Sequence, residues 1–112
     1  MMHELLESVK GLVREELTRV TAQHGSDYHS LHEAYAVMLE ELEEAEHELQ
    51  SLKFDTSAVW NGTKRDNYHT ARTAANSALI HAMFAACESI QVAAVATKVL
   101  KTIDRIEKEM QD

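Results

Sequence analysis

Proline is absent from this chain of 112 residues, and glycine occurs only three times, at Gly11, Gly25 and Gly62. Sheet proteins need many turns, and turns depend on glycine and proline for their backbone angles. The scarcity of both therefore favours a few long helices. Alanine, leucine and glutamate are abundant, and they lose little side-chain freedom in a helix. The sequence predicts an all-α fold, with residues 1–112 forming a single domain.

The first two helices are predicted from apolar residues that recur at helical spacing. We expect these helices over residues 2–23 and 28–53. Gly25 lies between them and can adopt the positive φ that commonly ends a helix. Ser26 or Asp27 can cap the start of the second helix. Ser30 and Glu33 also have the spacing of a capping box, so this helix can instead begin one turn later.

The second half of the chain carries weaker boundary signals. Residues 54–62 are expected to form a loop that holds the only tryptophan, Trp60. A single helix over the rest would be roughly 70 Å long at 1.5 Å per residue, which is too long for so small a domain. We therefore expect a break near Asn76-Ser77, between helices over residues 64–75 and 77–110. The predicted architecture is an antiparallel bundle of about four helices.

Two apolar stripes define the predicted core. Heptad-like spacing in the second helix favours packing against a nearly antiparallel helix. Its stripe is Leu31, Tyr35, Met38, Leu42, Ala45, Leu49 and Leu52. The corresponding stripe of the last helix is Ile80, Phe84, Cys87, Gln91 and Ala94. Polar residues interrupt the apolar run 78–96, so a buried central helix is expected there and a membrane span is not.

Charge and cysteine content narrow the function classes. The net charge of −8 argues against binding of a nucleic acid polymer, which requires a basic face. It suits a divalent cation, although most acidic surfaces only keep a protein soluble. The single cysteine, Cys87, excludes an internal disulfide and fits the reducing cytoplasm. A helical chain this short leaves much apolar surface uncovered, so an oligomer is expected.

The densest cluster of charge is LEELEEAEHEL, which spans Leu39 to Leu49. At 100° per residue, Glu41 lies at the edge of the predicted buried face, and Glu44 follows one turn later on the same flank. Like charges at this spacing repel each other, and a bound cation relieves the repulsion. The alternative interpretation is an acidic face that contacts only water.

Glu88 lies among apolar residues of the last helix, with Gln91 one turn further on. A carboxylate in such surroundings must be paired, bind a metal or stay protonated. Hydrogen bonds from Glu88 and Gln91 to a polar neighbour are the alternative. If the two helices pack together, Glu41 and Glu44 can meet Glu88, and Gln91 adds an amide oxygen. Oxygen ligands of this kind suit Mg²⁺ or Mn²⁺, and such sites commonly hold nucleotide phosphates.

Two stretches, HEAYAVMLEELEEAEHEL (His32–Leu49) and CESIQVAAVATKVL (Cys87–Leu100), resemble the MazG-like all-α nucleoside triphosphate pyrophosphatases. The resemblance is greatest to the small phage and prophage members. The family pattern is EExxE followed downstream by ExxD. Glu40, Glu41 and Glu44 match EExxE, and Glu88 matches the first position of ExxD. Gln91 stands where the family has aspartate, and the two motifs are separated by a longer segment than in compact members.

The resemblance implies an Mg²⁺-dependent enzyme that cleaves a nucleoside triphosphate into a monophosphate and pyrophosphate. Glu41, Glu44 and Glu88 would be catalytic and would bind the metal, with Gln91 as a weaker, uncharged ligand. Family members assemble as homodimers or homotetramers, and their sites can draw on two chains. A non-catalytic helical module that binds nucleotide or protein is the alternative function, and Gln91 favours it. A purely structural helical oligomer is a third possibility.

A triphosphate site needs cations as well as a metal. Lys98 is the preferred candidate because it lies on the same side of its predicted helix as Gln91, and Lys64 and Arg65 are further candidates. Trp60 is a candidate for stacking on the base. Each of these residues has a simpler interpretation, a surface cation for the three basic residues and a core-closing aromatic for the tryptophan.

Overall fold

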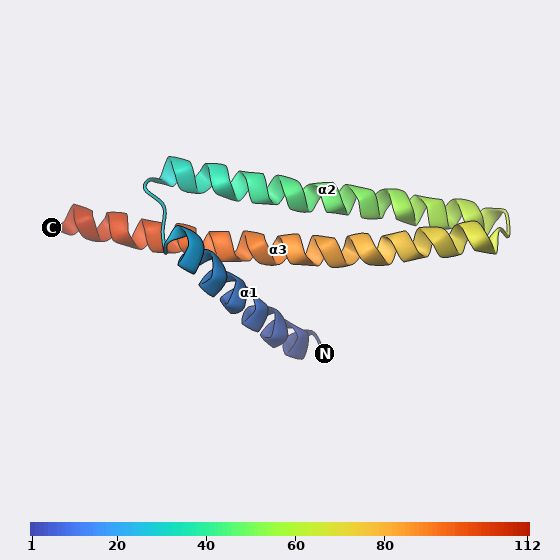
Figure 1. The fold of residues 1–112 in the computed structure, drawn as a ribbon, viewed down its shortest axis with the longest axis horizontal. Helices are drawn as coiled ribbons and strands as arrows, with labels where there is room; N and C mark the ends of the chain where they lie inside the picture. The colour runs from blue at the N-terminus through green and yellow to red at the C-terminus, as the bar shows by residue number, and fades with distance from the viewer. The chain divides into compact units, whose positions relative to one another are not determined.

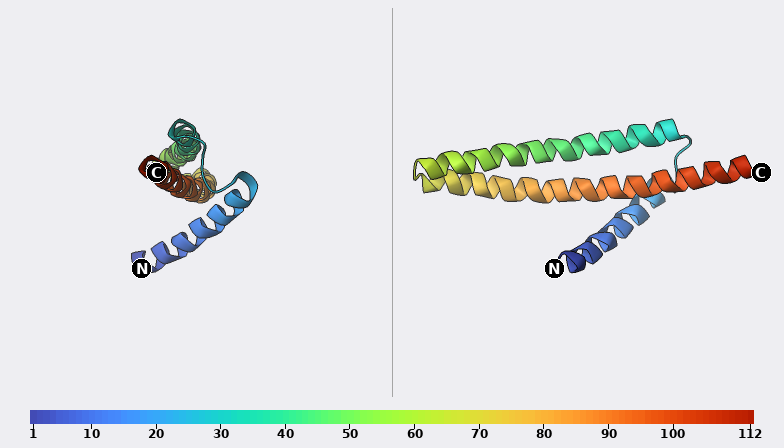
Figure 2. Two further views of the ribbon diagram at one scale, coloured as in Figure 1. Left: turned by 90° about the vertical axis from the view of Figure 1, so that its left-hand side faces the viewer. Right: turned by 180° about the vertical axis from the view of Figure 1, so that it is seen from behind.

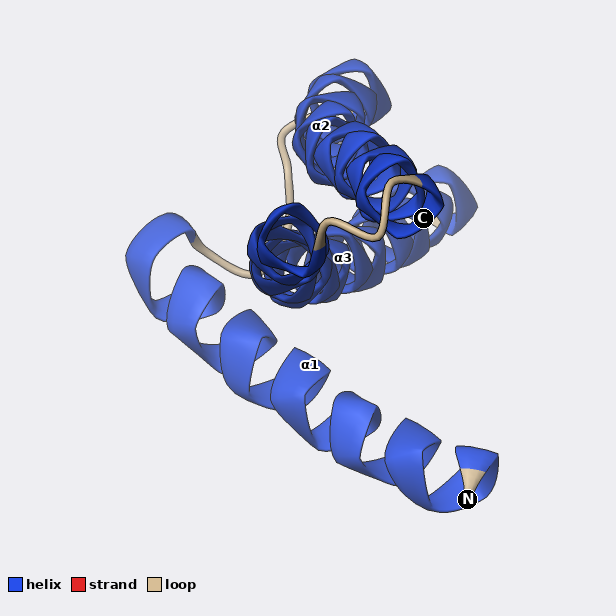
Figure 3. Cartoon of the chain, turned by 90° about the vertical axis from the view of Figure 1, so that its right-hand side faces the viewer, coloured by secondary structure: helices blue, strands red, loops and turns tan.

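The computed structural model describes residues 1–112 and contains three helices and no strand (Figure 1). The helices are α1 (Met2–His24), α2 (Leu31–Lys64) and α3 (Tyr68–Gln111), joined by two short connections (Figure 3). The prediction of an all-α fold is confirmed. The expected number of about four helices is wrong, because the second and third helices are longer than predicted.

The connection between α1 and α2 follows the local signals in the sequence. Gly25 ends α1 with a φ of 89°, and its N–H donates to the carbonyl of Thr21 at 2.9 Å. Ser30 Oγ accepts the N–H of Glu33 at 3.1 Å and so caps the start of α2. The boundary therefore lies at the later of the two predicted starts.

The loop predicted over residues 54–62 is helical, and the chain turns later, between Lys64 and Tyr68. Gly62 contributes to this turn because its carbonyl accepts the N–H of Asn67 at 2.9 Å. A Cβ on Gly62 would lie 2.8 Å from the backbone nitrogen of Ala71. Gly62 is thus required by a close approach of backbones beside the turn.

No break occurs at Asn76-Ser77, and α3 runs for 44 residues. Asparagine and serine each lower helix stability by only about 0.5 kcal/mol, which tertiary contacts readily offset. Ser77 makes such a contact, since its hydroxyl donates to Asp55 Oδ2 at 3.0 Å.

The chain divides into two compact units. Unit 1 comprises Met1–Leu42 and Ser89–Asp112, and unit 2 comprises Glu43–Glu88. Unit 2 is a hairpin in which the second part of α2 and the first part of α3 run antiparallel (green to orange in Figure 2). Its buried apolar residues are all alanines, namely Ala45, Ala74 and Ala85. Side chains this small let two helices approach closely.

Unit 1 contains the first part of α2, the last part of α3 and α1. Its core cluster is small and consists of Tyr28, Ala34 and Val95, with Val37, Met38 and Val99 packed against it. The helix α1 buries no residue of its own. Unit 1 therefore holds its core between α2, α3 and the connection that carries Tyr28.

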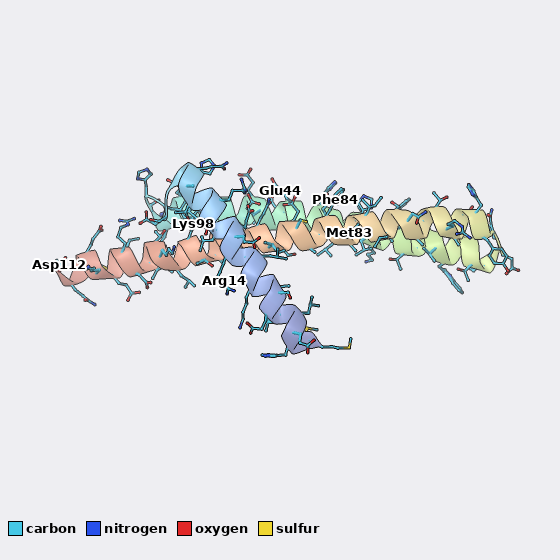
Figure 4. All side chains as sticks on the ribbon, turned by 60° about the horizontal axis from the view of Figure 1, so that its bottom comes forward. Arg14, Glu44, Met83, Phe84, Lys98 and Asp112 are labelled. Carbon is cyan, nitrogen blue, oxygen red and sulfur yellow. The ribbon has the colours of Figure 1, made fainter.

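Most of the predicted core stripes face outward. In α2, Leu31, Tyr35, Leu42 and Leu49 are exposed, and in α3, Ile80, Phe84 and Cys87 are exposed. Met83 and Phe84, labelled in Figure 4, are about half accessible. Two members of these stripes, Ala45 and Ala94, are buried, and the other buried positions of the two helices hold mainly alanine and polar residues. The apolar periodicity was real, but it marks a surface that the single chain leaves uncovered.

The same exposure corrects the expectation for α3. This helix is long and apolar enough to cross a membrane by length and composition alone, and only 17% of its most apolar window is buried. The prediction of a buried central helix is therefore wrong for this chain taken alone. The apolar side of α3 is thus largely exposed.

Candidate functional site

Two of the predicted metal ligands belong to unit 2. Glu44 is exposed on α2, and Glu88 is partly buried on α3. Burial raises the pKa of Glu88 above its ordinary value, and the charge of Glu44, a hydrogen bond with Glu44 and the charge of Glu48 raise it further. The Glu88 carboxyl group therefore lies close to other negative charges. A bound cation would offset their repulsion.

Glu41 precedes Glu44 by one turn of the continuous helix α2, so the two side chains share a flank. Ligand atoms from Glu41, Glu44 and Glu88 lie within 4.8 Å of one another. Three carboxylates at this spacing form the donor set that hard divalent cations prefer. Exposed acidic groups also cluster without any ion, so spacing alone does not identify a metal centre.

Unit 1 contains a pocket of about 660 Å³. It is lined by one end of α1, the following connection, the start of α2 and the last part of α3. The charged and polar lining residues include Glu16, Arg19, Asp27, His29, Glu33, Glu40, Glu41, Gln91 and Lys98. A volume of this size accommodates a small organic ligand. Three of the predicted site residues, Glu41, Gln91 and Lys98, line this pocket.

Lys98 is the most unusual residue of this pocket because only 3% of it is exposed. Its Nζ lies 4.4 Å from the centre of the Tyr28 ring. The prediction placed it on the side of the helix that carries Gln91, and both line the pocket. Its alternative interpretation as a surface lysine is wrong, since the side chain is buried.

Tyr28 is held by residues from the far end of α3. Thr102 Oγ1 accepts the backbone N–H of Tyr28 at 2.9 Å and donates to the carbonyl of Lys98 at 2.9 Å. Arg105 Nε donates to Asp27 Oδ2 at 2.6 Å, and an Nη donates to the carbonyl of Tyr28 at 2.7 Å. These contacts fix the connection between α1 and α2 against α3.

The tyrosine itself is kept neutral by its surroundings. Burial raises the pKa of Tyr28 above its ordinary value, and the negative charges of Glu41 and Glu33 raise it further. The phenol is therefore protonated at physiological pH and remains able to donate a hydrogen bond. Tyr28 was not predicted from the sequence, because a tyrosine in a polar connection carries no periodic signal, and its partners Thr102 and Arg105 were not predicted either.

Trp60, Lys64 and Arg65 lie far from the glutamates along the chain. Trp60 is exposed on α2, where Lys64 Nζ lies 5.7 Å from the centre of its ring. Sixteen residues of one helix separate Trp60 from Glu44, which corresponds to about 24 Å along the axis. A triphosphate is much shorter than that. The structure therefore does not bring these three residues together with the acidic cluster of the same chain.

Unit 2 holds a second polar cluster that the sequence analysis did not identify. Asp55 is buried, and its Oδ2 lies 2.6 Å from His81 Nδ1 and 3.0 Å from Ser77 Oγ. Ser77 Oγ and His81 Nδ1 are 3.4 Å apart. Both partners approach the same carboxylate oxygen, so no nucleophile–base–acid relay is formed. The cluster satisfies a buried charge within the hairpin.

No family model, curated protein or solved structure matches this chain. The resemblance to the MazG-like proteins therefore depends only on the residues quoted for it, Glu40, Glu41, Glu44 and Glu88 with the sequence around them.

Proposed function

We propose that the protein is an Mg²⁺-dependent nucleoside triphosphate pyrophosphohydrolase of the MazG-like kind. The observation that carries the proposal is the group formed by Glu41, Glu44 and Glu88, whose ligand atoms lie within 4.8 Å of one another. Carboxylate oxygens without histidine or cysteine favour Mg²⁺ or Mn²⁺ over zinc. The raised pKa of Glu88 fits this donor set, because crowded carboxylates gain most from a cation.

Glu41, Glu44 and Glu88 would hold the metal, and the amide oxygen of Gln91 would assist. When bound, Mg²⁺ supplies positive charge that binds the phosphates and stabilises the charge that develops during cleavage. One of these three glutamates would also position the attacking water and accept its proton. Gln91 cannot accept a proton in this way, so it serves only as an oxygen donor.

Lys98 would bind a phosphate oxygen of the substrate. Its ammonium is buried in a pocket whose other lining charges are mostly negative. A buried charge is costly unless it is compensated, and a phosphate supplies a charge-assisted hydrogen bond. The pocket volume of about 660 Å³ suits the rest of a nucleotide.

We further propose that the active form is a cytoplasmic homodimer or homotetramer. Apolar side chains remain exposed on both long helices, among them Leu42, Leu49, Ile80 and Phe84. An uncovered apolar surface of this extent commonly marks a protein interface. Light scattering coupled to size exclusion should give two or four chains, and a monomeric mass would contradict this part of the proposal.

The direct test is pyrophosphate release from a panel of NTPs and dNTPs in the presence of Mg²⁺. The wild-type chain should release pyrophosphate from at least one substrate, and the activity should disappear with EDTA. Glu41→Gln removes a ligand charge and should abolish turnover. Glu43→Gln changes an exposed glutamate of the same helix and is the matched control, which should retain activity. Equal inactivity of the wild type and Glu41→Gln on every substrate would refute the enzyme.

A non-catalytic nucleotide- or protein-binding module is the second candidate, and Gln91 is the residue that favours it. An amide contributes no charge, so it holds a cation more weakly than aspartate does. Calorimetry with a triphosphate and Mg²⁺ should then show binding without turnover. Gln91→Asp separates the candidates further. If the glutamine is what weakens metal binding and prevents turnover, this variant should bind the metal more tightly and should release pyrophosphate.

A further inference from the structure

Lys98 is buried, and its ammonium contacts an aromatic ring. Its Nζ lies 4.4 Å from the centre of the Tyr28 ring, and the residue lines the pocket of unit 1. No carboxylate forms an ion pair with it, although several acidic residues line the same pocket. An aromatic face attracts a cation without neutralising it. The contact with the ring therefore leaves the ammonium able to bind an anionic ligand.

Hydrogen bonds to the backbone of Tyr28 add to the packing of its side chain in the core cluster with Ala34 and Val95. Thr102, which is fully buried, joins the Tyr28 backbone N–H to the Lys98 carbonyl through one hydroxyl. Arg105 binds the Tyr28 carbonyl at 2.7 Å and the carboxylate of Asp27 at 2.6 Å. The backbone of Tyr28 is thus fixed on both sides to the helix that carries Lys98.

We propose that Tyr28 is a positioning residue whose ring, clamped by Thr102 and Arg105, holds the Lys98 ammonium in the pocket to receive the phosphate of a ligand. This rests on the proposed function in taking the ligand to be a nucleoside triphosphate. The connection between α1 and α2 is then part of the binding site. A ring in place of a carboxylate is essential to the arrangement, because an ion pair would compete with the phosphate.

The test measures binding of inorganic tripolyphosphate with Mg²⁺ to the full chain by calorimetry. Tyr28→Phe keeps the ring and should bind within twofold of the wild type. Tyr28→Leu removes the ring and should weaken binding about tenfold, as should Lys98→Met, and the double variant should lose no more than either. Tyr68→Leu, an exposed tyrosine of unit 2, is the control and should change nothing. Equal affinity of Tyr28→Leu and the wild type would overturn the proposal.

Two further measurements separate positioning from mere structure. Phenylalanines carrying one, two and three fluorines at position 28 keep the ring's shape while weakening its attraction for a cation. The dissociation constant should rise steadily along this series, and a constant value would overturn the proposal. In NMR spectra, the ring should shift the ε-methylene protons of Lys98 upfield in the wild type and in Tyr28→Phe, and Tyr28→Leu should abolish the shift.

The outcomes also distinguish this proposal from the proposed function. If tripolyphosphate binds as expected but no triphosphate is hydrolysed, the enzyme is refuted and the role of Tyr28 stands. If hydrolysis is observed and Tyr28→Leu leaves the dissociation constant unchanged, the role of Tyr28 alone is refuted. Failure of the wild type to bind tripolyphosphate would overturn the assignment of Lys98 as a phosphate ligand, and with it this inference.

Discussion

Units 1 and 2 are both built on α2 and α3, but only unit 1 adds further segments to these helices and forms a pocket. Unit 1 encloses a pocket of about 660 Å³ and buries a lysine beside an aromatic ring. Unit 2 is a hairpin packed through alanines, with Asp55 satisfied by Ser77 and His81 and with Glu88 crowded by Glu44 and Glu48. A helix pair closed by small residues holds polar groups at fixed positions. A third segment is needed to enclose a ligand, and the connection carrying Tyr28 supplies it in unit 1.

The largest expected effect distinguishes Glu88, a proposed metal ligand, from the acidic residues that lie outside the proposed metal site. Glu88→Gln should lower kcat/KM for pyrophosphate release about 100-fold or more, because electrostatic stabilisation of the transition state depends on the ligands that hold the metal. Glu43→Gln should stay within twofold of the wild type. Equal rates for the two variants would remove the functional role assigned to Glu88.

The next effect concerns stability and belongs to unit 2. Asp55→Ala should lower the free energy of unfolding by about 2 kcal/mol, because Ser77 and His81 lose the carboxylate that binds them both. Asp104→Ala, at an exposed position of α3, should change it by less than about 0.5 kcal/mol. Urea unfolding checks both values. A loss no larger for Asp55→Ala than for the control would mean that the buried cluster contributes nothing to the hairpin.

A smaller effect is expected at the pocket of unit 1. Lys98→Met should weaken nucleotide binding about tenfold, since one charge-assisted hydrogen bond contributes about 1.5–3 kcal/mol and solvent replaces part of it. The variant should unfold no more easily than the wild type, because methionine fills a similar volume without a buried charge. Lys101→Met, at an exposed position one turn away, should bind as the wild type does. Unchanged binding by Lys98→Met would exclude the lysine from the site.

The smallest effect is a pH dependence of stability in the absence of divalent cations. The pKa of Glu88 is raised in the folded protein, so the wild type loses stability as the pH rises through that raised pKa. Glu88→Gln lacks this loss. It should therefore be more stable at neutral pH by about 0.5 kcal/mol, the scale of a partly exposed like-charge pair. The difference should vanish below the ordinary carboxyl range.

Thermal unfolding across that pH range measures the difference. Adding Mg²⁺ at neutral pH should reverse its sign, because a cation bound to the folded wild type stabilises it by mass action. A difference that does not depend on pH would assign the effect to packing instead of charge.

The sequence predicted the fold class and the helix ends that local chemistry controls. The positive φ of Gly25 and the cap from Ser30 are both confirmed, since each depends on only a few neighbouring residues. The predicted break at Asn76-Ser77 was wrong, because a tertiary contact such as that of Ser77 with Asp55 outweighs the low helix propensity of these two residues. The prediction of a loop around Trp60 was wrong, because Gly62 is needed for the close approach of two helices beside the turn and does not end the helix.

The identity of the core residues and part of the candidate site could not be predicted, because spacing along one helix does not show which other segment that helix contacts. Leu42 and Phe84 appeared to be core residues by their spacing, yet they are exposed, and alanines occupy the buried positions. Periodicity identifies an apolar face without stating whether it contacts the same chain or another. Spacing placed Gln91 and Lys98 on one side of their helix, and both line the pocket together with Glu41. Tyr28 and Arg105 could not be found, because nothing in the sequence joins residues so far apart.

The central claim is that Glu41, Glu44 and Glu88 hold a divalent cation that engages a nucleotide. The most direct measurement is anomalous diffraction from a crystal grown with Mn²⁺ and a non-hydrolysable nucleoside triphosphate. The account predicts an anomalous peak within about 2.5 Å of carboxylate oxygens of these three residues, bridged to the phosphates. A nucleotide bound with the manganese elsewhere, or no manganese peak at these glutamates, would contradict it.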